Sequence, residues 1–237
     1  MLGLAAFAAL GYADTITTYT FTTPGGATDV GGNLAATVAF GIDTTTDALY
    51  VSITNDEPDP TSAAQLISGL SFVLSNGGTA GALSNKISST VGTSTDVTVL
   101  NGDMPDPTSS TTTTLPASWQ LSYGSGGYFL NDLTGGSPEN MIIGPAPYTH
   151  ANSSINNHQP SLAGTVVFQI DNFTGLNAST TVSSVELAFG TGPDGYSTLC
   201  TTDCGGGTLG GEAPEPMTFV LAGAGLLGLG LLKRRRA

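Results

Sequence analysis

Apolar and polar residues alternate with a period of two in many stretches of the chain, which is the pattern of half-buried β-strands. Thr, Val, Ile and aromatic residues dominate these stretches, and Gly, Pro and Asn separate them. No segment between them repeats with the period of an amphipathic helix. Ten strands are predicted, at Thr15 to Thr22, Ala35 to Gly41, Leu49 to Thr54, Gly69 to Leu74, Asp96 to Leu100, Ser118 to Tyr123, Tyr128 to Asn131, Met141 to Ile143, Gly164 to Ile170 and Val182 to Phe189.

Short strands with turn-rich connections predict an all-β fold. We expect an antiparallel β-sandwich of jelly-roll-like type rather than a parallel sheet. The segment from Ile42-Asp43 to Asp47-Ala48, with Thr between, is predicted to be a hairpin loop. Residues 14 to 212 would form this one domain, because about 200 residues suit a single core.

The N-terminal residues 1 to 13 have the features of a secretory signal peptide. Residues 2 to 10 form an apolar run too short to span a bilayer, and Gly11 and Ala13 are the small residues that a cleavage site after Ala13 requires. The usual basic n-region is missing, as in a truncated signal. The alternative is a buried strand of the domain, since an apolar run alone does not define its structure.

The C-terminal residues 213 to 237 combine a Pro-Glu-Pro motif, an uncharged apolar run and a basic end. Met217 to Leu232 is predicted to be a transmembrane helix, although its 16 residues span only about 24 Å. The basic anchor, Lys233, Arg234, Arg235 and Arg236, should stay cytoplasmic by the positive-inside rule. The domain before it is therefore expected on the export side of the inner membrane, and finally at the cell surface or outside the cell.

Pro214, Glu215 and Pro216, followed by a Gly/Leu-rich helix and a terminal Arg cluster, resemble the PEP-CTERM sorting signal. The resemblance covers residues 213 to 236 and implies an exosortase as partner, an integral-membrane Cys protease-like enzyme thought to cut at or near the motif. An ordinary membrane anchor is the alternative. A sorting tail is an address, so it implies nothing about the activity of the domain.

Charge is unevenly distributed along the chain. Asp14 to Glu212 contains 17 acidic residues and one basic residue, Lys86, which gives this stretch a net charge of −16. Such a surface repels phosphate backbones and anionic headgroups, so nucleic acid is excluded as a partner. Cations, neutral glycans such as extracellular polysaccharide, and other proteins remain, together with the secretion machinery.

An internal repeat relates residues 56 to 77 to residues 103 to 124. Ten of the 22 aligned positions are identical, including D-x-P-D-P-T-S and S-[FW]-x-L-S-x-G, with Phe72 opposite Trp119. Each unit is interpreted as an acidic, proline-stiffened loop that leads into a strand, with the two loops at equivalent corners of the fold.

The repeated loops carry the candidate metal ligands, Asp56 and Asp59 in the first and Asp103 and Asp106 in the second. Carboxylate oxygens on a backbone restrained by proline suit Ca²⁺, which takes 6 to 8 oxygen ligands. The spacing differs from that of a known calcium loop, so rigid solvated turns are the alternative.

The remaining polar candidates have simple interpretations. Cys200 and Cys204 are expected to form a small disulfide loop in an exported protein. His150 and His158 lie in a polar loop without clustered carboxylates, so they are interpreted as solvated rather than as metal ligands. Thr108 to Thr114 is a low-complexity run that is either a flexible loop or a carrier of O-glycans.

No catalytic motif stands out, so the chain is not expected to be an enzyme or to need a cofactor beyond the calcium considered above. The leading interpretation is an exported surface or extracellular-matrix-associated structural protein, processed at its C-terminal signal. A lectin-like glycan-binding module is the alternative, and a glycoside hydrolase follows it. For glycan binding, the candidate aromatic residues are Trp119, Tyr123, Tyr128 and Tyr148.

Overall fold

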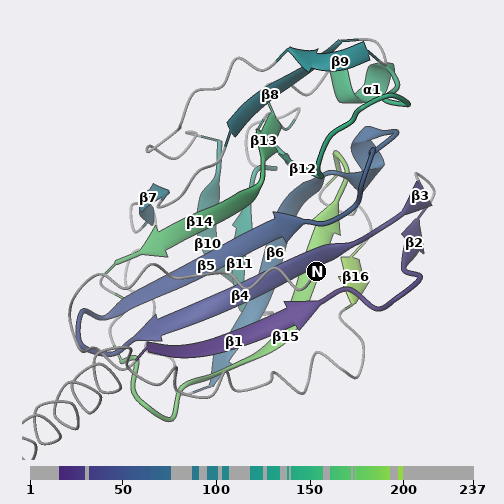
Figure 1. The fold of residues 1–237 in the computed structure, drawn as a ribbon. Coiled ribbons are helices and arrows are strands. Elements are labelled where there is room, and N and C mark those ends of the chain that lie inside the picture. Colours follow the sequence, from purple (N-terminus) through teal and green to yellow (C-terminus); the bar gives the residue numbers. More distant parts are fainter. Residues whose placement is uncertain are drawn as a thin grey trace, which may run out of the picture.

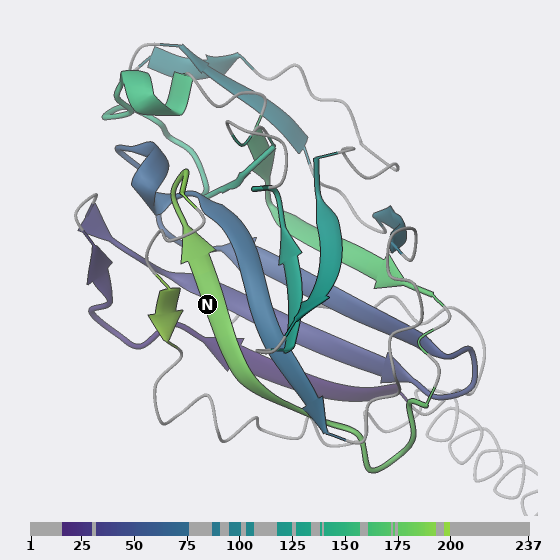
Figure 2. The ribbon, with the colours of Figure 1, turned by 180° about the vertical axis from the view of Figure 1, so that it is seen from behind.

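The computed structural model describes residues 16–29, 32–75, 87–90, 95–100, 103–106, 118–124, 127–133, 138, 140–156, 161–171, 173, 175–192 and 197–199. Most of them belong to β-strands, which form two large sheets packed face to face (Figure 1). All ten predicted strands are present, and their ends differ from the predictions by at most two residues. Seen from behind, β6 and β15 cross over the strands of the other sheet (Figure 2).

The first sheet has five strands within the described ranges, in the order β1-β4-β5-β14-β7. Each neighbouring pair in it is antiparallel. The buried positions of β4 and β5 include Val38, Phe40, Val51 and Ile53, which alternate with residues on the opposite face. The strands are β1 (Ile16–Thr22), β4 (Ala36–Asp43), β5 (Ala48–Asn55), β14 (Thr165–Ile170) and β7 (Ile87–Thr90).

The predicted hairpin loop joins β4 to β5, with Asp43 paired to Ala48. The Asp43 carboxylate accepts hydrogen bonds from Thr45 N at 2.8 Å, from Thr46 N at 3.1 Å and from Thr46 Oγ1 at 2.6 Å. Burial on its own raises the pKa of Asp43, but these hydrogen bonds outweigh it and the pKa is lowered. Asp favours turns because its carboxylate can accept hydrogen bonds from the N–H groups of the same turn, as Asp43 does here. This local preference is why the loop could be predicted from the sequence.

The second sheet has nine strands in the described part of the chain, and β6 is its centre. β11 and β12 pair along one edge of β6, and β15 pairs along the other. The strands are β6 (Ile67–Ser75), β8 (Thr95–Leu100), β9 (Asp103–Asp106), β10 (Gln120–Gly124), β11 (Gly127–Asn131), β12 (Ile142–Ile143), β13 (Ser161–Ala163), β15 (Thr181–Phe189) and β16 (Ser197–Leu199).

Two features of this topology correct the sequence-based expectation. β12 and β13 pair in parallel, so the second sheet is mixed rather than wholly antiparallel. The chain between them includes the helix α1 (Ser153–Asn156), and a parallel pair needs such a crossover connection. In the first sheet β1, β4 and β5 lie side by side, and the short loop between β4 and β5 keeps these two strands adjacent. In a jelly roll the chain would instead cross from one sheet to the other between such strands.

Eight short elements of the described chain were not predicted from the pattern: β2, β3, β7, β9, β13, β16, η1 and α1. A two-stranded ribbon joins β2 (Thr28–Asp29) to β3 (Gly32–Asn33), and a 3₁₀ helix, η1, spans Ala63–Gln65. The helix α1 has four residues, too few to display a helical period in the sequence.

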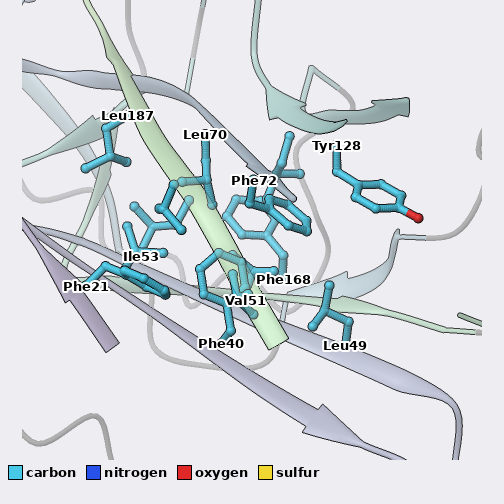
Figure 3. Close-up of a cluster of buried hydrophobic side chains, with 14 of the residues drawn as sticks. Phe21, Phe40, Leu49, Val51, Ile53, Leu70, Phe72, Tyr128, Phe168 and Leu187 are labelled. Carbon is cyan, nitrogen blue, oxygen red and sulfur yellow. The ribbon is translucent and has the colours of Figure 1, made fainter. Parts of the chain in front are cut away.

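The main core lies between the two sheets and is built around aromatic rings (Figure 3). Phe40 of β4 and Phe72 of β6 face each other across the layers with their ring centroids 5.0 Å apart. Phe72 in turn stacks on Tyr128 of β11, with centroids 5.3 Å apart. The Tyr128 hydroxyl points away from the labelled cluster in Figure 3, so the ring contributes its apolar body to the core.

Candidate functional site

The first acidic loop runs from Asp56 to Ser62 and joins β5 to η1, with β6 following. Its start is held by Asn55, whose side chain is buried. Asn55 Nδ2 donates to the carbonyl oxygens of Gln65 at 2.8 Å and Ile142 at 3.0 Å, and Asn55 Oδ1 accepts from Glu57 N at 3.1 Å. One buried amide therefore ties both ends of the loop to the second sheet.

A second buried amide, Gln65, holds the end of the loop. Its Oε1 accepts from Thr61 N at 2.7 Å and from Thr61 Oγ1 at 2.9 Å, and its Nε2 donates to Asn33 O at 2.9 Å. Gln65 is 2% exposed, so these hydrogen bonds replace the water that its amide loses on burial. The inward-pointing side chains of Asn55 and Gln65 therefore fix both ends of the loop.

The loop packs against the segment 144–154, which follows β12. Asp59 N donates to Pro145 O at 3.3 Å, Asn152 N donates to Thr61 O at 2.8 Å, and Ala63 N donates to Ser154 Oγ at 2.9 Å. A second, smaller apolar cluster lies beneath this contact. Its members are Ala63, Leu66, Met141, Ile143, Tyr148, Ala151 and Ile155.

Gly144 and Tyr148 shape the facing segment. A Cβ at position 144 would overlap the carbonyl oxygen of Glu57, so only glycine permits this approach of the two backbones. Tyr148 donates a hydrogen bond from its hydroxyl to Gly144 O at 2.9 Å, and burial raises the pKa of Tyr148 to about 12. The segment is thereby fixed at the place where the loop contacts it.

The Asp59 carboxylate lies at the outer rim of this contact and accepts four hydrogen bonds. Thr149 N and His150 N donate to Oδ1 at 2.7 and 3.3 Å, and Thr149 Oγ1 donates to Oδ2 at 2.8 Å. His150 Nδ1 lies 2.6 Å from the same Oδ2. The hydrogen bonds from His150 and Thr149 lower the pKa of Asp59 to about 2, so the carboxylate is ionised at neutral pH.

Asp59 reaches this position with a backbone φ of 51°, in the left-handed region. Aspartate tolerates this region better than most residues with a side chain. His150 is an exposed loop residue, as predicted, with 73% of its side chain accessible, but its contact with Asp59 was not predicted. The two residues are 91 positions apart, and no local pattern links them.

Of the four predicted calcium ligands, the structure describes the side chains of Asp56 and Asp59, and both accept hydrogen bonds from neighbouring residues. Both oxygens of Asp59 are used by Thr149 and His150, and Asp56 Oδ2 accepts from Thr37 Oγ1 at 2.7 Å. Among the described residues, no group of three or more His, Cys, Asp and Glu side chains is placed to hold a metal ion. The side chains of Asp103 and Asp106 lie outside the description.

The two repeat units differ in local structure. The first D-x-P-D segment is a loop, whereas Asp103–Asp106 forms the strand β9, which pairs with β8. The expectation of two acidic loops at equivalent corners is therefore corrected. Pro105 suits an outer strand because it lacks an N–H for a second ladder. The strands that follow do correspond, since β6 and β10 flank β11 on its two sides.

Glu57 is a feature of the loop that sequence reasoning missed. Its side chain is buried at 9% exposure, and no hydrogen bond to its carboxylate is seen among the described residues. Burial raises the pKa of Glu57 because the charged form loses hydration. The net negative charge of the chain gave no sign that one of its acidic residues would be largely buried.

The four aromatic residues proposed for glycan binding do not line a shared groove. Trp119 is 3% exposed, packs on Phe168 at 4.9 Å and donates from Nε1 to Asn140 O at 2.9 Å. Tyr128 belongs to the main core and Tyr148 to the smaller cluster. Only Tyr123 of the four is exposed, at 62%.

Several sequence-based predictions fall on residues outside the described part. They include Pro214, Glu215 and Pro216, the basic anchor Lys233 to Arg236, the helix 217 to 232, Cys200, Cys204 and His158. Within the described ranges, no helix has the length and apolar character that crossing a membrane requires.

The arrangement around Asp59 is thus a docking contact between two loops, built from two buried amides, one glycine and one ionised carboxylate. At this contact Thr149 Oγ1 also lies 3.0 Å from His150 Nδ1, so a hydroxyl, an imidazole and a carboxylate meet at the surface. Comparisons of the chain with protein-family models, with curated proteins and with solved structures gave no match.

Proposed function

We propose that the chain is an exported bacterial surface or matrix-associated structural protein, processed at a C-terminal sorting signal. The observation that carries this proposal is the order of three elements in the tail. Pro214, Glu215 and Pro216 precede a 16-residue apolar run, and the basic residues Lys233 to Arg236 follow it. In this proposal residues 217 to 232 form a single transmembrane helix, and an exosortase-type enzyme cuts near Glu215.

The described domain supports a structural role through what its polar groups do. Hydrogen bonds of three polar side chains, those of Asn55, Gln65 and Asp59, hold loops to the sheets. Three of the four candidate glycan-binding aromatics pack inside the protein, so no observation favours a lectin-like module over a structural protein. The proposed scaffold needs a stable fold outside the cell, and the hydrogen-bonded buried amides of Asn55 and Gln65 support this part of the proposal.

The processing signal is tested by replacing Glu215 with Ala, and separately by deleting residues 233 to 236. We expect unprocessed or mislocalised protein in both cases, seen by intact mass and by fractionation of membranes and medium. Glu212→Ala, which removes an acidic residue just outside the motif, is the matched control and should be processed normally. A mature wild-type protein that still ends at Ala237 would refute the proposal.

Export also makes a disulfide between Cys200 and Cys204 part of the proposal. Peptide mapping of the exported protein under non-reducing conditions should recover the two cysteines joined. Two free thiols that can be alkylated would contradict the disulfide, while leaving the sorting signal untouched.

A further inference from the structure

Three Asn-x-Ser/Thr tripeptides occur in the chain, and this tripeptide is the acceptor motif for N-linked glycans on exported proteins. A chain rich in Ser and Thr contains such short motifs by composition alone, so the motif by itself selects none of the three. The fold determines which of them an enzyme can reach. The three are Asn152-Ser153-Ser154, Asn172-Phe173-Thr174 and Asn177-Ala178-Ser179.

The third tripeptide forms the tip of a turn that leads into β15. Asn177, Ala178 and Ser179 are all exposed. Their neighbours Leu176 and Thr180 are buried, at 6% and 1% exposure. Two hydrogen bonds close the turn, from Thr180 N to Asn177 O at 2.9 Å and from Asn177 N to Thr180 Oγ1 at 3.0 Å. Three consecutive exposed residues therefore project from a base that is anchored in the core.

Within this turn the two side chains that define the motif lie against each other. Ser179 donates to Asn177 Oδ1 twice, from its N–H at 2.9 Å and from its hydroxyl at 2.5 Å. Asn177 Nδ2 donates to Gly175 O at 3.2 Å, which uses one of its two N–H groups. Glycosylation replaces only one N–H of the amide, so the modified residue can keep this contact. The acceptor amide and the required hydroxyl are thus presented together at the surface.

Contacts with the rest of the domain set the other two tripeptides apart. In the first, the hydroxyl oxygen of Ser154 accepts a hydrogen bond from Ala63 N at 2.9 Å. An enzyme that bound this hydroxyl would have to break the docking of the first acidic loop. In the second, the middle residue Phe173 is 1% exposed, and its N–H donates to Asp47 O at 2.8 Å. The folded domain therefore favours Asn177 as the acceptor.

We propose that Asn177 is an N-glycosylation site of the folded domain. The donor is an oligosaccharide linked to a polyprenyl pyrophosphate, and the enzyme is a membrane-bound glycan transferase on the export side. Asn177 Nδ2 attacks C1 of the first sugar, so that the N–C1 bond forms, the C1–O bond to the pyrophosphate breaks, the lipid pyrophosphate leaves and the amide loses one proton to water. This inference rests on the export that the proposed function includes, because donor and acceptor must meet on the same side of the membrane.

The experiment maps the protein purified from the cells that produce it, by digestion with chymotrypsin and mass spectrometry that preserves glycans. Cleavage after Phe173 separates Asn172 from Asn177. We expect added glycan mass on the peptide that contains Asn177. Ser179→Ala should remove all of this mass, whereas Ser179→Thr keeps the hydroxyl and should retain it. Ser154→Ala removes the hydroxyl of another tripeptide and is the matched control, in which the glycan on Asn177 should be unchanged.

The intact mass of the same samples reports C-terminal processing, so the two proposals can fail separately. An unmodified Asn177 in wild-type protein that has lost its C-terminal tail would overturn this inference alone. A glycan on Asn177 in protein that still ends at Ala237 would support it and refute the processing. Glycan mass that survives Ser179→Ala would also overturn the inference, since its attachment would not depend on the tripeptide. Thermal scans of each variant show whether the domain is still folded.

Discussion

His150 Nδ1 lies 2.6 Å from Oδ2 of Asp59, which joins residues 91 positions apart. The contact closes the docking of the first acidic loop on the segment 144–154. Thr149 completes it, because its N–H and hydroxyl also donate to the Asp59 carboxylate. One ionised side chain therefore holds a loop that follows β5 against a loop that follows β12, and it does so at the protein surface.

Replacing Asp59 with Asn should lower the Tm at neutral pH. Asn tolerates the left-handed backbone conformation equally well, so the substitution removes the charge and leaves the loop geometry in place. The folded pKa of Asp59 is about 2, below its unfolded value near 4, so its stabilisation is complete above about pH 5 and disappears as the pH falls through 2.

The Tm difference between wild type and Asp59→Asn should therefore shrink as the pH is lowered from 7 toward 2.5, measured by thermal scans at constant ionic strength. His150→Ala is the companion variant and should have the smaller effect, because Thr149 still donates to Asp59. A difference that stays constant across this range would contradict the charge-dependent contact.

Glu57→Gln should raise the Tm at pH 7. Burial raises the folded pKa of Glu57, which means that its ionised form is less stable in the folded protein than in the unfolded chain. The expected change in Tm is therefore opposite in sign to the change expected for Asp59→Asn. The gain from Gln should be largest above the folded pKa and should vanish below about pH 4, where Glu57 is neutral in both states. Equal Tm values at pH 7 would show that the carboxylate is adequately solvated.

Gly144→Ala should destabilise the protein by about 1–3 kcal/mol, because the added Cβ overlaps the carbonyl oxygen of Glu57 and forces two backbones apart. Gly25→Ala is the matched control, since a Cβ there meets nothing within 4 Å, and it should be neutral or slightly stabilising. Urea denaturation of both variants measures the difference. Equal stabilities would mean that the loops are not in close contact in solution.

Calcium should leave the Tm unchanged relative to Mg²⁺ and to a chelator at matched ionic strength. Hydrogen bonds occupy both oxygens of Asp59, so the first loop offers too few ligands. A true site would be obvious, because a ligand at ~100 times its Kd stabilises the folded state by ~2.7 kcal/mol. A Ca²⁺-specific rise in Tm that Asp59→Asn and Asp106→Asn abolish would establish the loops as calcium sites.

The long strands were predictable because each buries one face against the core and so alternates in its own sequence. β4, β5 and β14 show this directly, with Phe40, Val51 and Phe168 on the buried face. The strands β2, β3 and β13, with two or three residues each, contain too few positions to alternate. Strand partners were not predictable either, since Thr54 pairs with Thr165 across a separation that no local pattern records.

The sequence by itself determined that the chain is rich in β-strands, where its long strands lie and where its acidic charge is concentrated, because these properties are local along the chain. Tertiary structure alone decided which of its polar groups act together. Asp59 became a docking carboxylate and Glu57 a buried one, although both belong to the same short acidic loop. The physical reason is that burial and hydrogen bonding depend on what the fold brings from distant positions, here the segment 144–154.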